Sequence, residues 1–227
     1  MRRVTRIIVL TLGVLLTVAG VIAAVVVGPG DRVGLGSEEL ATENAAMATP
    51  TSALNMVGPT LHVTAAAADG EIFIGAGHEM DVGAYLTGFA HELIVPDGDP
   101  PLDPLTADAD FPWQPTLEPV AGSEGQPAAT PASRDWWFAS VAGPGEQALA
   151  VELGNDPLRV VVMRPDGTAP VAADVEFELE IDNMFSTALT IAAIGAALIL
   201  LGIFTLRLRP ARRGRAGRSS HDEAVQP

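Results

Sequence analysis

Two residue types are missing from this 227-residue chain: cysteine and lysine. Without cysteine there are no disulfides and no thiolate chemistry, so any folded domain must be held together by its core alone. Without lysine there is no Ser-x-x-Lys pair, and neither a G-x-S-x-G elbow nor a phosphate-cradling glycine loop is present. These absences argue against nucleophilic catalysis, and we expect the chain not to be an enzyme.

Positive charge is scarce and concentrated at the two ends. Residues 28–184 carry 26 carboxylates against four arginines, a formal net charge of −22. The remaining nine arginines stand at the ends with two acids, a net charge of +7. Binding to nucleic acid needs a basic surface, so the acidic middle excludes nucleic acid as a partner.

Two uncharged apolar runs, residues 7–27 and 185–206, separate the basic ends from the acidic middle. About 20 apolar residues span the hydrocarbon core of a bilayer, and flanking arginines stay on the cytoplasmic side. We therefore predict two transmembrane helices in the cell membrane, with residues 1–6 and the basic tail 207–227 both cytoplasmic. Residues 28–184 are then extracytoplasmic. No ionisable residue lies within either run, which argues against transport or proton relay.

The first run has alternative interpretations. A secretory signal has an apolar region of about 7–15 residues, which is shorter than this run. Val21 and Ala23 nevertheless fit a small-residue cleavage site, so cleavage stays open. Small residues form a ridge on each run, which lets the two helices pack with each other or with a partner; an alanine-rich composition is the competing explanation. These residues are Gly13, Thr17, Gly20 and Ala24 in the first run, and Ala188, Ala192 and Ala196 in the second.

Between the runs we expect a linker over 28–52 and a mainly antiparallel β domain over 53–184. Strands are predicted at Leu61–Ala67 and Glu71–Gly75 around an Asp69–Gly70 turn. Four more strands follow from Asp135 as a meander, with turns at GPG, GNDP and RPDGTA. The apolar spacing of Val82, Tyr85, Leu86, Phe89 and Leu93 predicts one short helix with Asp81 as its N-cap. The fold class is thus an α+β membrane protein with a sandwich-like extracytoplasmic domain.

Residues 96–133 hold half of the chain's 18 prolines. Proline lacks a backbone donor, so this stretch is predicted to be a long loop or extended connector, and never a central strand. We expect Phe111 and Trp113 to dock it on the domain. The adjacent Trp136, Trp137 and Phe138 should point to both faces of a strand, one being core. The other face is covered by the proline-rich loop or presents a ligand platform.

The last predicted strand is the most regular charged feature. Val175, Phe177, Leu179 and Ile181 alternate with an acidic row, which is typical of a half-buried antiparallel strand. The row is Asp174, Glu176, Glu178, Glu180 and Asp182. Alternate residues on a strand lie about 7 Å apart, too far for neighbours to share a ligand. The row repels itself unless Arg159 or Arg164 faces it, and it is either a solvated face or an interaction face for a cationic partner.

Metal sites have weaker support. His78–Glu79 and His91–Glu92 begin like metalloprotease motifs, but valine replaces the second histidine in each. His78, Asp81 and His91 remain as candidate zinc ligands. Asp97, Asp99 and Asp103 have the spacing of oxygen ligands for calcium, without the glycine and terminal glutamate of an EF-hand loop. We expect no metal and no cofactor.

Three blocks occur in order: FIGAG followed by DVGAYLTGFAH, then DWWFAS, then VVVMRPDG ahead of the acidic strand. Together they resemble a family of uncharacterised actinobacterial two-pass membrane proteins, over roughly 53–206. The family commonly has Asn–Ala where this chain has Arg164–Pro165, which puts any role of that asparagine in doubt. The resemblance implies two membrane segments and a cell-envelope location, and it brings no catalytic residue.

The hypothesis that follows is an interaction or scaffolding module, whose partners are the lipid bilayer and another membrane or envelope protein. One alternative is an extracytoplasmic sensor that signals through its helices to a separate cytoplasmic partner. The other is a metal-dependent envelope enzyme around His78, Asp81 and His91. No linker separates Asp182 from the second apolar run, so we also expect the domain to be held close to the bilayer.

Overall fold

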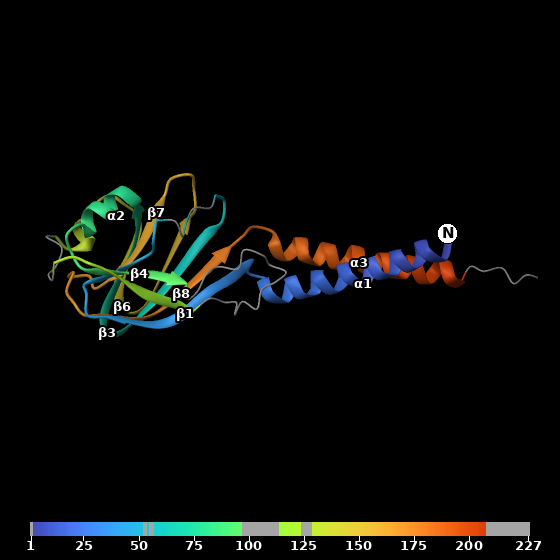
Figure 1. Cartoon of the computed structure of the whole chain (residues 1–227), viewed down its shortest axis with the longest axis horizontal. Helices are drawn as coiled ribbons and strands as arrows, with labels where there is room; N and C mark the ends of the chain where they lie inside the picture. The colour runs from blue at the N-terminus through green and yellow to red at the C-terminus, as the bar shows by residue number, and fades with distance from the viewer. Residues whose placement is uncertain (1, 52–53, 55–56, 97–113, 124–128, 208–227) are drawn as a thin grey trace, which may run out of the picture. The chain divides into compact units, whose positions relative to one another are not determined.

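The computed structural model describes residues 2–51, 54, 57–96, 114–123 and 129–207 (Figure 1). The chain forms two compact units. One comprises Met1–Ile22 with Ala188–Pro227, and the other comprises Ala23–Thr187. Phe111, Trp113 and the aspartates of the calcium hypothesis, Asp97, Asp99 and Asp103, lie outside the described residues.

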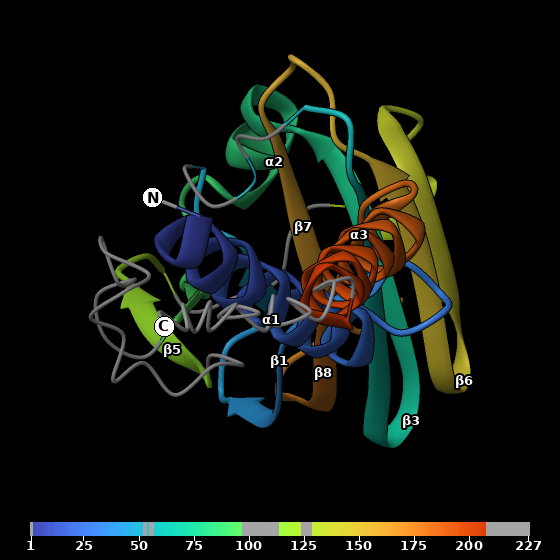
Figure 2. The ribbon, with the colours of Figure 1, turned by 90° about the vertical axis from the view of Figure 1, so that its right-hand side faces the viewer.

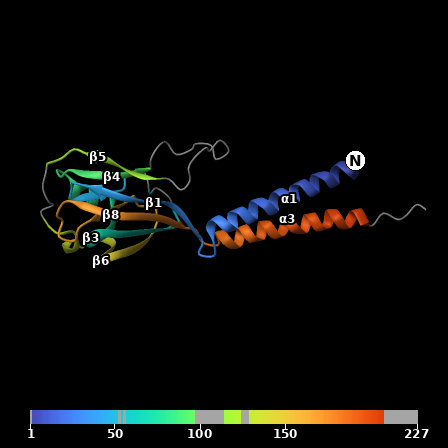
Figure 3. The same ribbon diagram turned by 90° about the horizontal axis from the view of Figure 1, so that it is seen from below.

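The first unit contains most of two helices, α1 (Arg2–Val27) and α3 (Met184–Arg207). Their segments Val4–Val27 and Met184–Phe204 are long and apolar enough to cross a membrane. The two helices run side by side (Figure 3). A Cβ atom on Gly20 would lie 2.5 Å from the backbone nitrogen of Ala192, and one on Gly195 would lie 2.5 Å from that of Thr17. Of the two expected uses of the small-residue ridges, the structure shows the pairing of these helices with each other.

The second unit is an eight-stranded sheet with one short α-helix, α2 (Glu79–Leu86), and a 3-10 turn, η1 (Pro131–Ser133). The strands are β1 (Arg32–Thr42), β2 (Ala46–Ala48), β3 (Thr60–His78), β4 (His91–Pro96), β5 (Pro115–Val120), β6 (Trp137–Glu152), β7 (Leu158–Met163) and β8 (Val171–Glu180). Their order is β1-β8-β3-β7-β2-β4-β5, and β6 pairs with β3. Every pair is antiparallel except β2 with β4, so the sheet is mixed.

The sheet is a nearly closed barrel, and the expected sandwich is wrong. The reason lies in β3, which pairs along one edge with β6. Along its other edge it pairs first with β8, over Thr60–Ala67, and then with β7, over Phe73–His78. Two branches therefore leave the same strand, one ending at β1 and the other at β5, and these ends approach each other (Figure 3).

Both β3 and β6 are single long strands, which corrects the two hairpin turns expected at Asp69–Gly70 and at GPG. The ladder between them runs from Thr60 opposite Glu152 to Gly77 opposite Trp137, with a register shift between Ala66 and Glu71. Gly70 (φ 82°) and Gly145 (φ 71°) lie at this shift, in the left-handed region that glycine adopts without strain. The two turn signals thus produce matching bends in paired strands instead of chain reversals.

The expected linker over 28–52 contains β1 and β2. The strand β1 is hard to detect because a bulge between Gly34 and Gly36 breaks its alternation. At its start, the backbone carbonyl of Asp31 accepts a hydrogen bond from the Ile181 N–H (2.9 Å). The Asp31 carboxylate accepts one from the Phe185 N–H (2.7 Å), which satisfies a donor in the first turn of α3.

The helix α2 is shorter than expected and begins earlier. Its N-cap is His78, not Asp81, because the His78 ring nitrogen accepts from the Met80 N–H. Val82, Tyr85 and Leu86 are buried as the spacing predicts, whereas Leu93 belongs to β4. Within the proline-rich stretch, the described strand β5 is an edge strand that pairs only with β4, in keeping with its prolines.

Apolar side chains fill both faces of the middle of the sheet. Inside the barrel, β3 and β7 contribute Ile72, Ile74, Val160 and Val162 to the main core. On the other face, the same strands contribute Phe73, Val161 and Met163, which pack beneath α2. A strand buried on both sides has a nearly continuous apolar sequence, and in β7 only Arg159 interrupts it.

Candidate interaction face

The acidic row lies on the outer face of β8. Along this strand every second residue from Val171 to Leu179 is apolar and buried, and the carboxylates between them are exposed or half-buried. Paired residues in antiparallel strands point to the same side of a sheet. The neighbours of the row are therefore the outer residues of β1 on one side and of β3 on the other.

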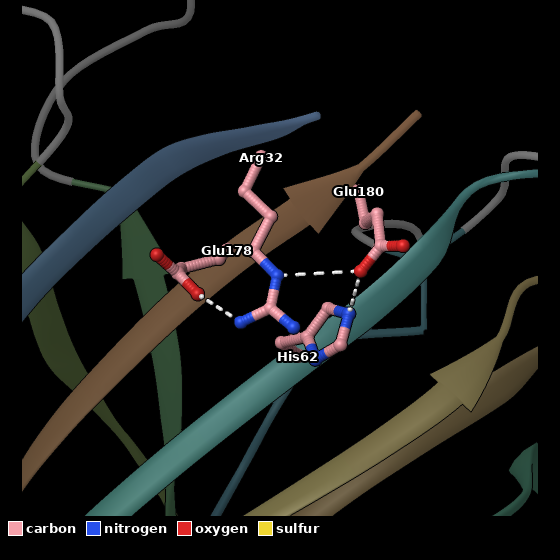
Figure 4. A network of polar contacts seen from close by, with 4 residues as sticks. All are labelled: Arg32, His62, Glu178 and Glu180. Atoms are coloured by element: carbon pink, nitrogen blue, oxygen red, sulfur yellow. Dashed lines mark hydrogen bonds and ion pairs between the residues drawn. The ribbon is translucent and has the colours of Figure 1, made fainter. Parts of the chain in front are cut away.

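Two basic side chains from those neighbours contact one end of the row (Figure 4). From β1, the Arg32 guanidinium lies 3.3 Å from Glu178 Oε2 and 3.3 Å from Glu180 Oε2. From β3, His62 Nε2 lies 2.7 Å from the same Glu180 oxygen. Arg32 and the two glutamates are about one-third to one-half exposed, so each ion pair contributes about 1 kcal/mol or less to stability.

The other end of the row has no such partner. Asp174 and Glu176 are exposed, and neither forms an ion pair within the described part of the chain. Opposite Asp174, β1 places a further exposed carboxylate, Glu39. We call Glu39, Asp174, Glu176, Glu178 and Glu180, with Arg32 and His62, the acidic face. Asp182 follows the end of β8 and lies outside it.

Neither arginine expected near the row faces it. A meander would pair β7 with β8, but the two strands lie end to end along one edge of β3. Arg159, on β7, is buried and donates from Nε to the Thr49 carbonyl oxygen at 2.8 Å. Burial lowers the pKa of this guanidinium, and the charge of Glu79 opposes that shift.

Arg164 leaves the end of β7 and lies 3.8 Å from Asp166. A hydrogen-bonded Thr168 lowers the pKa of the Asp166 carboxyl. Arg164 and Asp166 line an open surface cavity of about 430 Å³ together with Glu71 and Gly70. One cation against two carboxylates gives this cavity no preference for an anionic ligand.

The three candidate zinc ligands have separate surroundings. His78 caps α2 and places its ring edge-on to Phe138, and Asp81 is exposed in the first turn of α2. His91 is buried on β4, where Nδ1 lies 3.0 Å from the Phe89 carbonyl oxygen. A carbonyl only accepts, so that nitrogen carries a proton. Among the described residues, no group of three histidine, aspartate or glutamate side chains could hold a metal ion.

Trp136 and Trp137 lie against each other on the α2 side of the sheet, with ring centroids 4.1 Å apart. Gly75 makes room for Trp137 and Gly77 for Trp136, since a Cβ at either glycine would lie 2.8 Å from that ring. The end of the proline-rich stretch covers this cluster: the Trp137 indole donates to the Pro131 carbonyl (2.9 Å), and the Tyr85 hydroxyl donates to that of Ala129 (2.9 Å). The covering loop, one of the two expected alternatives, is therefore what the structure shows for the two tryptophans. They lie on one face and not on both as expected, and Phe138 is exposed.

Sequence reasoning identified the acidic row but missed the side chains that pair with it. Arg32 stands in a glycine-rich segment with no strand signal of its own, and nothing local indicates that it pairs with residues near position 180. His62 lies in a predicted strand, but nothing in that strand indicates which residue its side chain meets. Only the strand order, which comes from long-range pairing, brings it to Glu180.

Compared with known proteins, the sequence matches no family model and no curated protein. The geometry of the acidic face and of the sheet around it is therefore what supports a functional proposal.

Proposed function

We propose that the chain is a two-pass protein of the cell membrane, with both termini cytoplasmic and residues 28–184 outside. The length and apolar composition of α1 and α3 support membrane insertion. Arginines lie just before the first apolar run and just after the second. They support this orientation, since positive residues stay on the cytoplasmic side. The three sequence blocks that resemble actinobacterial two-pass membrane proteins agree with this placement.

Fusions of a reporter to the chain test this topology. Alkaline phosphatase fused after residue 120 is expected to be active, and green fluorescent protein fused there to be dark. Fusions after residue 227 should give the opposite result. An active phosphatase at residue 227 would overturn the proposed orientation.

Within this topology, the sheet unit acts as an interaction module that binds a cationic partner protein and performs no chemistry of its own. The observation that carries this proposal is the pair of exposed carboxylates, Asp174 and Glu176, with Glu39 beside them and no ion-pair partner within the described residues. Like charges on neighbouring strands destabilise a sheet. A bound cationic surface would relieve that repulsion, and the charge of −22 over residues 28–184 would attract such a partner from a distance.

The test uses the full chain in lipid nanodiscs and a nine-arginine peptide as the probe. Asp174→Asn with Glu176→Gln removes two charges from the acidic face and is expected to weaken binding by roughly fivefold at low salt. Asp135→Asn with Asp156→Asn removes two exposed charges elsewhere and serves as the control. Equal losses in the two double variants would show attraction by net charge alone and would contradict a defined face.

A further inference from the structure

The strand β6 has one edge that no other described strand pairs with. Within the described part of the chain, β3 is the only strand that pairs with it, and it follows β6 from Trp137 to Glu152. β6 is the outermost strand on its side of the sheet unit (Figure 2). In an antiparallel strand, every second residue directs its N–H and C=O away from the paired neighbour. The outer edge of β6 therefore presents a row of backbone donors and acceptors, which fits an added strand.

The bend at Gly143–Gly145 divides this edge into two parts. Pro144 has no N–H to donate, and Gly145 has a φ of 71°, so a straight strand cannot continue across them. This interruption is a usual form of edge protection. The part before it begins at Trp137, and the part after it is Glu146–Glu152.

The second part, Glu146–Glu152, is a rigid template for pairing. Its inward side chains, Leu149 and Val151, are buried in the main core and fix the backbone. Its outward side chains between the two glutamates are Ala148 and Ala150, which are exposed and small. The edge amides are thus held in place by the core without large side chains beside them.

Charge identifies the kind of strand that fits. Glu146 and Glu152 are both exposed and point to the same side of the sheet as the acidic face. The register aligns Glu152 with Thr60 and Glu180, and Glu146 with Ala66 and Asp174. Six residues of strand separate the two glutamates by about 20 Å. An added strand with basic residues six positions apart would meet a carboxylate at each end.

We propose that the Glu146–Glu152 edge of β6 takes an extended basic segment of a partner protein as an additional β-strand. The proposal rests on the proposed function, and it names how the cationic partner is held. The partner's backbone pairs with β6, and its basic side chains lie over Glu146, Glu152 and the acidic face beyond them. A second copy of this chain fits less well, since its net charge of −22 over residues 28–184 would repel.

The test uses the full chain in nanodiscs and a seven-residue peptide with arginine at both ends and alternating valine and threonine between them. Hydrogen exchange is expected to slow at alternate amides of Glu146–Glu152 when the peptide is added. Ala148→Lys places a positive side chain on this edge and is expected to weaken peptide binding roughly tenfold. Ala142→Lys is the matched control, because Ala142 is also exposed on β6 but lies before the bend. The Ala142→Lys variant should bind the peptide within twofold of the affinity of the unchanged chain. Unchanged circular dichroism confirms that both variants fold.

A second peptide separates strand pairing from attraction between charges. Methylation of every internal amide nitrogen keeps the charge and removes the donors that pairing needs. Equal binding of the methylated peptide would overturn strand addition and leave the proposed function standing, as would equal losses in the two lysine variants. Strand addition by a basic partner would also be overturned if neither peptide binds. The same holds if the amides of Glu146–Glu152 become protected without peptide as the protein concentration rises. The proposed function fails separately, if the Asp174→Asn, Glu176→Gln variant binds the nine-arginine peptide unchanged.

Discussion

At the scale of single residues, Tyr85 reports on the packing beneath α2. It is the chain's one tyrosine, and burial raises its pKa to about 12, against a smaller opposing effect of Arg134. The guanidinium of Arg134 lies 5.6 Å from the centre of the Tyr85 ring. The phenol thus has an apolar body within the core and a polar tip on the Ala129 carbonyl.

We expect absorbance at 295 nm to titrate Tyr85 with a midpoint near 12 in the folded chain. In denaturant the midpoint should return to about 10, the value of a free tyrosine. Since the folded state keeps its proton to higher pH, the contribution of Tyr85 to stability is complete below about pH 10 and is lost between about pH 10 and 12. A midpoint near 10 before unfolding would contradict the burial described here.

Asp31 lies just before β1 and accepts hydrogen bonds from the backbone after β8 and at the start of α3. Its carboxylate accepts the Phe185 N–H at a distance of 154 residues in sequence, as an N-cap side chain does locally. Asp31→Ala removes this acceptor, and we expect the Phe185 amide to exchange with solvent roughly fivefold faster, the equivalent of about 1 kcal/mol. Asp31→Asn keeps an acceptor oxygen and tolerates the positive φ of 57°, so it should change the exchange rate less. Equal rates in all three chains would show that the bond contributes nothing.

At the scale of elements, glycine sets the distance between α1 and α3. A Cβ on Gly20 would lie 2.5 Å from the Ala192 nitrogen and 2.7 Å from the Ala188 carbonyl oxygen, and backbone atoms cannot give way as a flexible side chain can. Gly20→Val is therefore expected to force the helices apart and to lower the thermal midpoint of the chain in detergent. Ala19→Val, one residue earlier and exposed, adds a comparable volume on the outer surface and should leave the midpoint nearly unchanged. A similar loss in both variants would mean that close packing at Gly20 is not what holds the pair.

An element can be predicted from the sequence when the residues that determine it are neighbours in the chain. The two apolar helices and the alternation of β8 follow from runs of neighbouring residues, and both were predicted. The single long strands β3 and β6 were missed because Asp69–Gly70 and Gly143–Gly145 are good turn signals by themselves. Only the opposing strand shows that each signal is used as a bend. The pairing of Arg32 with Glu178 could not be predicted for the same reason. A row of acidic residues indicates that a basic partner is needed, but not where in the sequence that partner lies.

At the scale of the whole molecule, charge repulsion opposes folding of the acidic middle. Residues 28–184 carry a net charge of −22, and the described ion pairs involve few of their carboxylates. The screening length shrinks from about 30 Å at 0.01 M salt to about 3 Å at 1 M, so added salt removes long-range repulsion first. We expect the thermal midpoint of the sheet unit to rise with sodium chloride over this range. Sucrose of equal osmolarity is the control for solvent effects, and a midpoint that falls with salt would show that attractive pairs dominate.

The place of β3 in the sheet has a consequence for the order in which the chain can fold. Its partners β6, β7 and β8 all begin after residue 136, and among the described strands β1 pairs only with β8. Neither β1 nor β3 can therefore complete its strand pairing until nearly all of residues 28–184 has been synthesised. Such distant pairings make folding slow, and apolar strands stay exposed during the delay. A chain cut short before β8 would leave β1 without any partner and β3 with one edge half open, so the last strand completes the barrel that the first strands begin.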